Sequence, residues 1–237
     1  MNVQFGVAKI NKYATSESGD TLEMIERPHG GLSLVLVDGQ RSGRAAKLIS
    51  NVVARKAIQL LAEGVRDGAA ARAAHDYLFT YRGGKVSATL NIVSIDTHSR
   101  TIVISRNNEA PVLLHTPHKG VVELNAPSEA VGVHRNTKPV ITEVPIELGT
   151  VVVAFTDGLR HAGRISGTTT FDVTAVFRRL LTEQVYDAQR IANILLDEAM
   201  GLAQGRPNDD ISVMVVSVRE TPPNEVRRLS GNLPLRV

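Results

Sequence analysis

The chain contains no cysteine and no tryptophan, and its aromatic residues are limited to four tyrosines and five phenylalanines. The absence of cysteine excludes disulfides, thiolate catalysis and thiolate-ligated metals, and it is typical of a reducing compartment. No apolar run approaches the roughly 18 residues of a membrane-spanning helix. The first 20 residues also lack the basic and then apolar layout of a secretory signal. We therefore predict a cytoplasmic protein with no membrane segment.

Long runs of one charge are missing as well. The formal net charge is +3, yet no basic run is longer than a pair such as Arg178-Arg179 or Arg227-Arg228. A nucleic-acid surface needs a dense basic stripe and aromatic stacking platforms. The sequence therefore predicts no nucleic-acid binding, and its mildly basic balance favours an acidic or phosphorylated partner.

Apolar residues make up 43% of the chain, which is enough for a substantial core. Their periodicity predicts one α+β domain over residues 1–218, with a tail or docked extension over residues 219–237. The predicted helices cover residues 43–61, 67–81, 171–183 and 187–203. The predicted strands cover residues 3–9, 22–27, 32–37, 86–95, 101–105, 111–115, 120–124, 140–146, 150–156 and 211–216. Most of these strands follow one another directly, which indicates an antiparallel meander.

Two aspartates flank the first predicted hairpin. Asp20 precedes the strand at residues 22–27, and Asp38 follows the strand at residues 32–37. The intervening turn, residues 28–31, contains Pro28, His29 and two glycines. Because the start of one strand and the end of the next share one end of an antiparallel hairpin, we expect Asp20 and Asp38 to be neighbours.

A second acidic pair occurs near the end of the chain. Asp157 follows the strand at residues 150–156, while Asp209 and Asp210 precede the strand at residues 211–216. If these strands run antiparallel in one sheet, the three carboxylates also share an end. Both Asp38 and Asp157 are followed by glycine, which we expect to provide a sharp turn. Asp-Gly after a strand is a common turn, so only the joint arrangement indicates a site.

Carboxylates that converge raise one another's pKa unless a cation compensates them. Hard divalent ions such as Mg²⁺ and Mn²⁺ prefer oxygen ligands, and the sequence offers nothing softer here. Two such ions about 3.5–4 Å apart can share a carboxylate and activate a water for attack on phosphorus. The acidic set therefore predicts a two-metal phosphoester hydrolase.

Four motifs occur in a fixed order: SGD (residues 18–20), VDGQRSGRAA (residues 37–46), FTDGLRHA (residues 155–162) and NDDISVMVV (residues 208–216). Together they resemble the SpoIIE-like branch of the metal-dependent PPM serine/threonine phosphatases, over roughly residues 3–218. No sensor or receiver region precedes them, so the resemblance is nearest to the stand-alone stressosome phosphatases.

The resemblance implies a β-sandwich of two antiparallel sheets flanked by helix pairs, in α-β-β-α layers, with two Mn²⁺ or Mg²⁺ ions at one end. It implies that Asp38 bridges both ions and that the Gly39 carbonyl is a ligand. Asp157 and Asp209 match ligands of one ion, and Asp20 matches the acidic residue near the other. These four aspartates are thus the implied catalytic residues. Hydrolysis in the family proceeds by a metal-activated water, without a covalent enzyme intermediate.

The motifs depart from the family pattern at one important position. Relatives usually carry DGxGxG, whereas Arg41 replaces the middle glycine here. Arg41 either binds the substrate phosphate, which suits a guanidinium, or faces solvent in a different turn. The role of Asp210 is also open, because relatives carry Asp or Asn at that position. His161 and Arg206 lie close enough in sequence to approach the site, although exposed positions are the simpler interpretation for both.

The predicted function is dephosphorylation of serine or threonine in a signalling partner. The resemblance implies that this partner is a STAS-domain protein of a stressosome or partner-switching pathway. Two alternatives remain: a non-catalytic module that binds the same partners, and a two-metal hydrolase of small phosphoesters or nucleic acid. The complete acidic set disfavours the binding module, and the ordered motifs favour a protein substrate.

Overall fold

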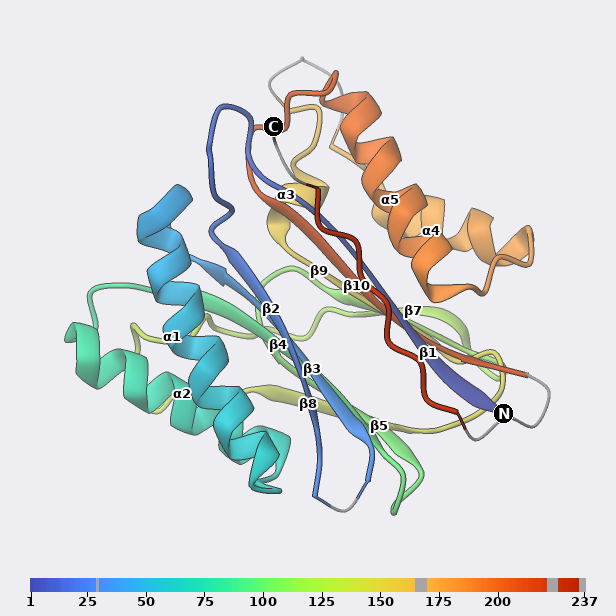
Figure 1. The fold of residues 1–237 in the computed structure, drawn as a ribbon, viewed down its shortest axis with the longest axis horizontal. Helices are drawn as coiled ribbons and strands as arrows, with labels where there is room; N and C mark the ends of the chain where they lie inside the picture. Colours follow the sequence, from blue (N-terminus) through green and yellow to red (C-terminus); the bar gives the residue numbers. More distant parts are fainter. Residues whose placement is uncertain (29, 165–169, 221–225, 235–237) are drawn as a thin grey trace.

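Two five-stranded antiparallel sheets pack face to face in the computed structural model, which describes residues 1–28, 30–164, 170–220 and 226–234. A pair of helices covers the outer face of each sheet (Figure 1). The predicted α+β sandwich with α-β-β-α layers is therefore confirmed. His29, in the turn predicted at residues 28–31, lies outside the described residues.

The first sheet has the strand order β1-β10-β9-β6-β7, and the second has the order β2-β3-β4-β5-β8. The strands of the first sheet are β1 (Asn2–Ile10), β10 (Ile211–Arg219), β9 (Val151–Phe155), β6 (Val112–Thr116) and β7 (Gly120–Leu124). Those of the second sheet are β2 (Asp20–Glu26), β3 (Leu32–Gly39), β4 (Ala88–Asp96), β5 (Thr101–Asn107) and β8 (Val140–Pro145).

Helices α1 (Gly43–Ala62) and α2 (Asp67–Arg82) pack on the second sheet. Helices α4 (Val173–Thr182) and α5 (Ala188–Leu202) pack on the first. A short helix, α3 (Asp157–Arg160), follows β9 directly. The sequence pattern had indicated a turn at this point, which is wrong because the chain instead makes one helical turn. Among the described residues, no helix combines the length and apolar character that a membrane span requires.

The core has three layers, one between the sheets and one under each helix pair. Strand β3 shows how one strand supplies two of them. Leu34 and Leu36 pack between the sheets, whereas Val35 and Val37 pack under α1 and α2. Because both faces of β3 are buried, its sequence is a continuous apolar run, and Asp38 stands at the end of a strand that is fixed on both sides.

The glycines after Asp38 and Asp157 are required by close approach of the backbone. A Cβ added at Gly39 would lie 2.1 Å from the carbonyl oxygen of Ala46 in α1, and one added at Gly158 would lie 2.1 Å from the carbonyl oxygen of Asp210. Neither glycine has a positive φ. The expectation of a sharp glycine turn is therefore wrong at both positions. Each glycine instead lets another backbone segment pack directly against the residue that follows the aspartate.

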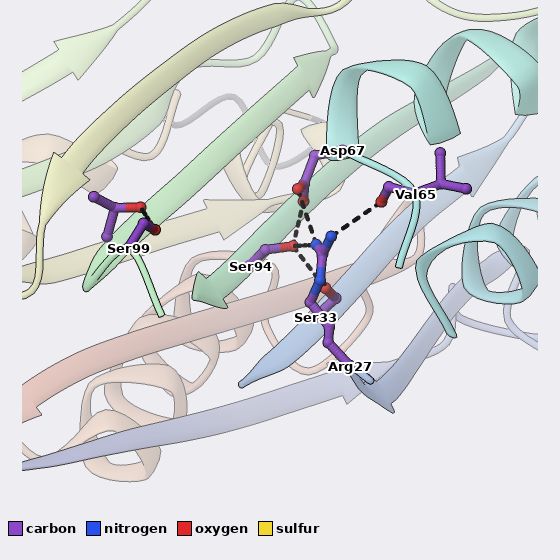
Figure 2. Close-up of polar contacts among 7 residues, drawn as sticks. Arg27, Ser33, Val65, Asp67, Ser94 and Ser99 are labelled. Carbon is purple, nitrogen blue, oxygen red and sulfur yellow. Dashed lines mark hydrogen bonds and ion pairs between the residues drawn. The ribbon is translucent and has the colours of Figure 1, made fainter. Parts of the chain in front are cut away.

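A buried polar network anchors α2 to the second sheet, at the end of the sheet that is opposite Asp20 and Asp38 (Figure 2). Arg27 Nη1 lies 3.0 Å from Asp67 Oδ2, and Arg27 Nη2 donates to the Val65 carbonyl at 3.0 Å. Ser94 Oγ donates to Asp67 Oδ1, and Ser33 Oγ lies 2.6 Å from Ser94 Oγ. The Arg27 and Asp67 side chains are only 12% and 7% exposed. The pair is thus a shielded ion pair whose remaining polar atoms are bonded.

Among the described residues past β10, residue 220 and residues 226–234 form no helix or strand. Arg227 Nη1 lies 2.5 Å from Glu26 Oε1 at the end of β2, so this segment contacts the sandwich. The division into a domain of residues 1–218 and a tail of residues 219–237 stays a prediction.

We expect Asp67→Ala to lower the free energy of unfolding by about 3–5 kcal/mol, because it leaves the shielded Arg27 guanidinium without a counter-charge. Glu198→Ala is the matched control, since Glu198 pairs with Arg179 on an open helix surface, and it should change stability little. Equilibrium denaturation in urea measures both variants. Equal effects of the two substitutions would contradict the role assigned to the network.

Candidate active site

Asp20 and Asp38 are directly opposite each other in the register of β2 and β3. The prediction placed them outside the strands, but Asp20 is the first residue of β2 and Asp38 belongs to β3. Directly opposed residues of an antiparallel pair face the same side of the sheet. Both carboxylates therefore face the interior of the sandwich, on the side of Leu36.

The first sheet contributes two further carboxylates. Asp157 begins α3 immediately after β9, and Asp209 lies two residues before β10. Strands β9 and β10 pair antiparallel, with Phe155 opposite Val213, so the end of one adjoins the start of the other. Asp157 and Asp209 are both half-buried. The structure thus brings acidic residues of both sheets to one end of the sandwich.

A cleft of about 380 Å³ opens at this end. Three of the predicted residues, Asp38, Asp157 and Asp209, line it together. Its other lining residues are Lys12, Gly39, Gln40, Arg41, Ser42, Ser87, Ala88 and Thr89. The cleft is therefore acidic on one side, and Lys12 and Arg41 are the two cations among its lining residues.

Asp20 does not line the cleft but lies behind it, with only 1% of its surface exposed. Its Oδ2 accepts hydrogen bonds from Ser212 Oγ at 2.6 Å and from Thr156 Oγ1 at 3.1 Å, both on the first sheet. Its Oδ1 is buried without a hydrogen-bond partner among the described residues. Asp20 thus links the two sheets and retains one buried oxygen that lacks a donor.

The cluster strongly disfavours full ionisation. Burial raises the pKa of Asp38 to about 9, and the nearby carboxylates of Asp20, Asp157 and Asp209 add to this effect. Burial also raises the pKa of Asp20 to about 6, against the hydrogen bond from Ser212. The pKa of Asp209 is raised by burial as well. The protein therefore supplies too little positive charge at this site to keep all of these carboxyl groups ionised.

The donor set fits hard divalent cations. All of its candidate ligands are oxygens, and Asp20 Oδ1 is a buried acceptor that lacks a donor. Among the described residues, no three His, Asp or Glu side chains stand close enough together to enclose an ion. The carboxylates thus line a common cleft, but no three of these described side chains are close enough to surround one ion, which agrees with their mutual repulsion.

Asp210 has a different environment from Asp209. Its Oδ1 accepts from the Lys12 backbone N–H and its Oδ2 accepts from the Gly19 backbone N–H, both at 2.8 Å. Asp210 is only 4% exposed. It therefore holds the connection between β1 and β2 in place, directly before Asp20.

Of the other polar residues considered from the sequence, His161 and Arg41 lie at the site and Arg206 packs on a tyrosine ring instead. His161 Nδ1 lies 3.6 Å from Asp157 Oδ2, so His161 does approach the site. The Arg206 guanidinium instead packs over the Tyr13 ring at 5.3 Å. Arg41 lines the cleft with φ of 82°, a left-handed conformation that favours glycine. Arg41 thus has a backbone conformation that a glycine would adopt without strain.

Sequence reasoning missed several supporting residues. Lys9 Nζ and Lys47 Nζ each donate to the main-chain carbonyl of Asp20 at 2.6 Å. Thr156 and Ser212 hold the Asp20 carboxylate from the other sheet. The sequence did carry a signal for Thr156 and Ser212, because each is a hydroxyl residue at an otherwise apolar strand and close to an acidic motif.

A model of the family described as "Stage II sporulation protein E (SpoIIE)" matches residues 28–219. The chain belongs to the SpoIIE family. Stage II sporulation protein E of Priestia megaterium is 21% identical over 221 residues, and that of Bacillus subtilis strain 168 is 20% identical. Both matches cover 93% of this chain but only 37% and 26% of those proteins, respectively.

Solved structures show the same fold. The PP2C phosphatase domain of B. subtilis SpoIIE with a fragment of its regulatory domain aligns with a TM-score of 0.77 at 20% identity, over 94% of this chain and 64% of that one. RsbX in complex with magnesium gives 0.67 at 16% identity, over 91% and 95%. The PstP catalytic domain with two manganese ions gives 0.67 at 15% identity, over 92% and 99%. The chain is thus a member of the SpoIIE family with the fold of the PP2C phosphatase domains.

The raised pKa of Asp38 predicts how the metal-free protein responds to pH. Its pKa rises from 3.8 to about 9 on folding, so the folded chain holds a proton that the unfolded chain releases. This contribution to stability is present below about pH 4 and is lost as the pH rises toward 9. In EDTA at pH 8 we therefore expect Asp38→Asn to unfold at a higher temperature than the wild type, with a smaller difference at pH 5.

Thermal unfolding followed by circular dichroism measures this effect, and Asp197→Asn, which replaces an exposed carboxylate of α5, is the control. A melting temperature of Asp38→Asn at or below that of the wild type at pH 8 would show that Asp38 is not electrostatically strained.

Arg41→Gly separates the two interpretations of Arg41. A non-glycine residue in a left-handed conformation costs about 1–2 kcal/mol, so the variant should be slightly more stable despite the added freedom of its unfolded chain. If Arg41 binds the substrate phosphate, KM for a phosphorylated substrate rises in the same variant. An unchanged KM assigns Arg41 to solvent.

Proposed function

We propose that the protein removes phosphate from serine or threonine of a signalling protein, through two divalent metal ions bound at the end of the sandwich. The observation that carries this proposal is the common cleft formed by Asp38, Asp157 and Asp209 from both sheets, with Asp20 buried behind it. Excess negative charge of this kind has little structural use, because it opposes packing of the two sheets. It becomes favourable when cations are bound.

Asp38 is central to the proposed metal site, since its pKa responds to the carboxylates of both sheets. Asp38, Asp157 and Asp209, with the Gly39 carbonyl and Asp20, are the residues that would hold the two ions. RsbX with magnesium and PstP with two manganese ions support this choice of Mg²⁺ or Mn²⁺. Bound ions of this type supply an activated water and neutralise developing charge on phosphate.

The chain's own cations complete the proposed site. Lys12 and Arg41 line the same cleft as the acidic residues, and a phosphate dianion needs positive partners there. The backbone of Lys12 is fixed by the Asp210 carboxylate, which orients this side of the cleft. We therefore assign Lys12 and Arg41 to binding of the substrate phosphate, and the four aspartates to the metal ions.

The proposed substrate is a phosphorylated STAS-domain protein of a stressosome or partner-switching pathway. Support comes from a similar structure described as "The bacterial stressosome: a modular system that has been adapted to control secondary messenger signaling", with a TM-score of 0.67 at 15% identity. The RsbU and RsbW domains of Rv1364c from Mycobacterium tuberculosis also share this fold, with a TM-score of 0.72.

The test is hydrolysis of p-nitrophenyl phosphate and of a phosphoserine protein with Mn²⁺, with Mg²⁺ and with EDTA. We expect turnover with either metal and none in EDTA. Asp38→Asn and Asp157→Asn should each lower kcat by at least about a hundredfold, because each removes a charged ligand of the metal ions that would stabilise the transition state. The exposed variant Asp197→Asn should retain wild-type activity.

Substrate choice separates the remaining candidates. Turnover of a nucleotide or an oligonucleotide in preference to the phosphoprotein would favour a two-metal hydrolase of small phosphoesters or nucleic acid. Inactivity of the folded wild type with both metals would instead favour a non-catalytic module that binds phosphoproteins.

A further inference from the structure

Positive charge is concentrated on the α1–α2 side of the molecule. Residues 41–85 contain nine lysines and arginines but only three acidic residues, whereas the rest of the chain contains more acidic than basic residues. One of those three acidic residues, Asp67, is buried against Arg27. The net positive charge of the protein therefore comes entirely from this helical hairpin and its two flanking segments.

The exposed cations of this hairpin lack counter-charges. Among the described residues, no ion pair involves Arg44, Arg55, Arg72, Arg82 or Lys85, and all five are exposed. The opposite side of the sandwich differs, because Arg179 pairs with Glu183 and Glu198 there. A surface with uncompensated cations attracts an anionic partner, and the attraction weakens with salt.

Two exposed tyrosines lie among these cations. Tyr77 and Tyr81 are 48% and 60% exposed, and their rings stack with centroids 6.0 Å apart. Lys56 of α1 lies over the Tyr77 ring at 5.9 Å, and Arg82 lies over the Tyr81 ring at 5.7 Å. Tyrosine and arginine are enriched among the residues that dominate protein interfaces. We call this group, together with Lys85, the basic tyrosine face.

The basic tyrosine face lies near the end of α2, from which the chain leads into the cleft. Gln40 N–H donates to the Ser87 carbonyl at 3.1 Å, and Ser87 N–H donates to Gln40 Oε1 at 3.2 Å. Gln40 and Ser87 both line the cleft. Tyr81 lies six residues before Ser87, so at about 3.5 Å per residue the two are at most about 20 Å apart. A substrate segment of similar length can therefore reach both sites.

We infer that the basic tyrosine face is a docking surface for an acidic region of the phosphoprotein substrate, which holds the phosphorylated residue over the cleft. This inference rests on the proposed phosphatase function and adds where the substrate binds. A nucleic acid fits the face less well, because the two tyrosine rings stack on each other and each has a cation over it, which leaves less ring surface on which a base can stack.

The experiment compares two synthetic phosphoserine peptides of equal length. One carries a block of Asp and Glu six residues from the phosphoserine, and the other carries Asn and Gln there. With Mn²⁺ at low salt we expect kcat/KM of the wild type to be about tenfold higher for the acidic peptide. The double substitution Arg82→Glu with Lys85→Glu should abolish that preference, and hydrolysis of the neutral peptide and of p-nitrophenyl phosphate should remain unchanged.

The matched control is Arg178→Glu with Arg190→Glu, which makes the same charge change on exposed residues of α4 and α5. This variant should keep the preference for the acidic peptide. Equal turnover of the two peptides by the wild type would overturn the docking surface and leave the phosphatase function standing. The docking surface is also overturned if the Arg82 and Lys85 substitutions abolish binding to an oligonucleotide or to anionic vesicles but leave the peptide preference intact. No turnover of any substrate would instead contradict the proposed function itself.

Discussion

The structure depends on one unfavourable interaction, the burial of like charges where the two sheets meet. Asp20 and Asp38 are opposed in register on the second sheet, and Asp20 is bonded to Ser212 and Thr156 on the first. Burial and mutual repulsion raise the pKa of both carboxyl groups. A core of apolar layers on either side of β3 holds them in this arrangement. The fold therefore stores electrostatic strain at one end, which the proposed cations would relieve.

Close contacts of the surrounding backbone hold these carboxylates in position. Gly39 and Gly158 allow α1 and the Asp210 segment to approach within distances that any side chain would block. The Asp210 carboxylate fixes the connection that precedes Asp20. At the far end of the second sheet, the Arg27–Asp67 pair anchors α2. Helix α1 thus packs against Gly39 of the cleft, and α2 carries the tyrosines of the basic tyrosine face.

Much of this arrangement could be predicted from the sequence. The apolar runs identified the strands, and the hairpin argument identified the opposition of Asp20 and Asp38. Helix α3 was missed because its four residues are too few to show a period. The close approaches at Gly39 and Gly158 depend on distant segments, so local pattern could not reveal them. The same applies to the burial of Asp20 behind the cleft, because its partners come from the other sheet.

The most direct test of the account is calorimetric titration of the protein with Mn²⁺ at pH 8, in buffers of different ionisation enthalpy. Because Asp38 has a pKa of about 9 without metal, metal binding should release close to one proton from it. We predict that this release is lost in Asp38→Asn, together with most of the affinity. Binding without proton release, or binding that Asp38→Asn leaves unchanged, would contradict the view that the buried carboxylates form the metal site.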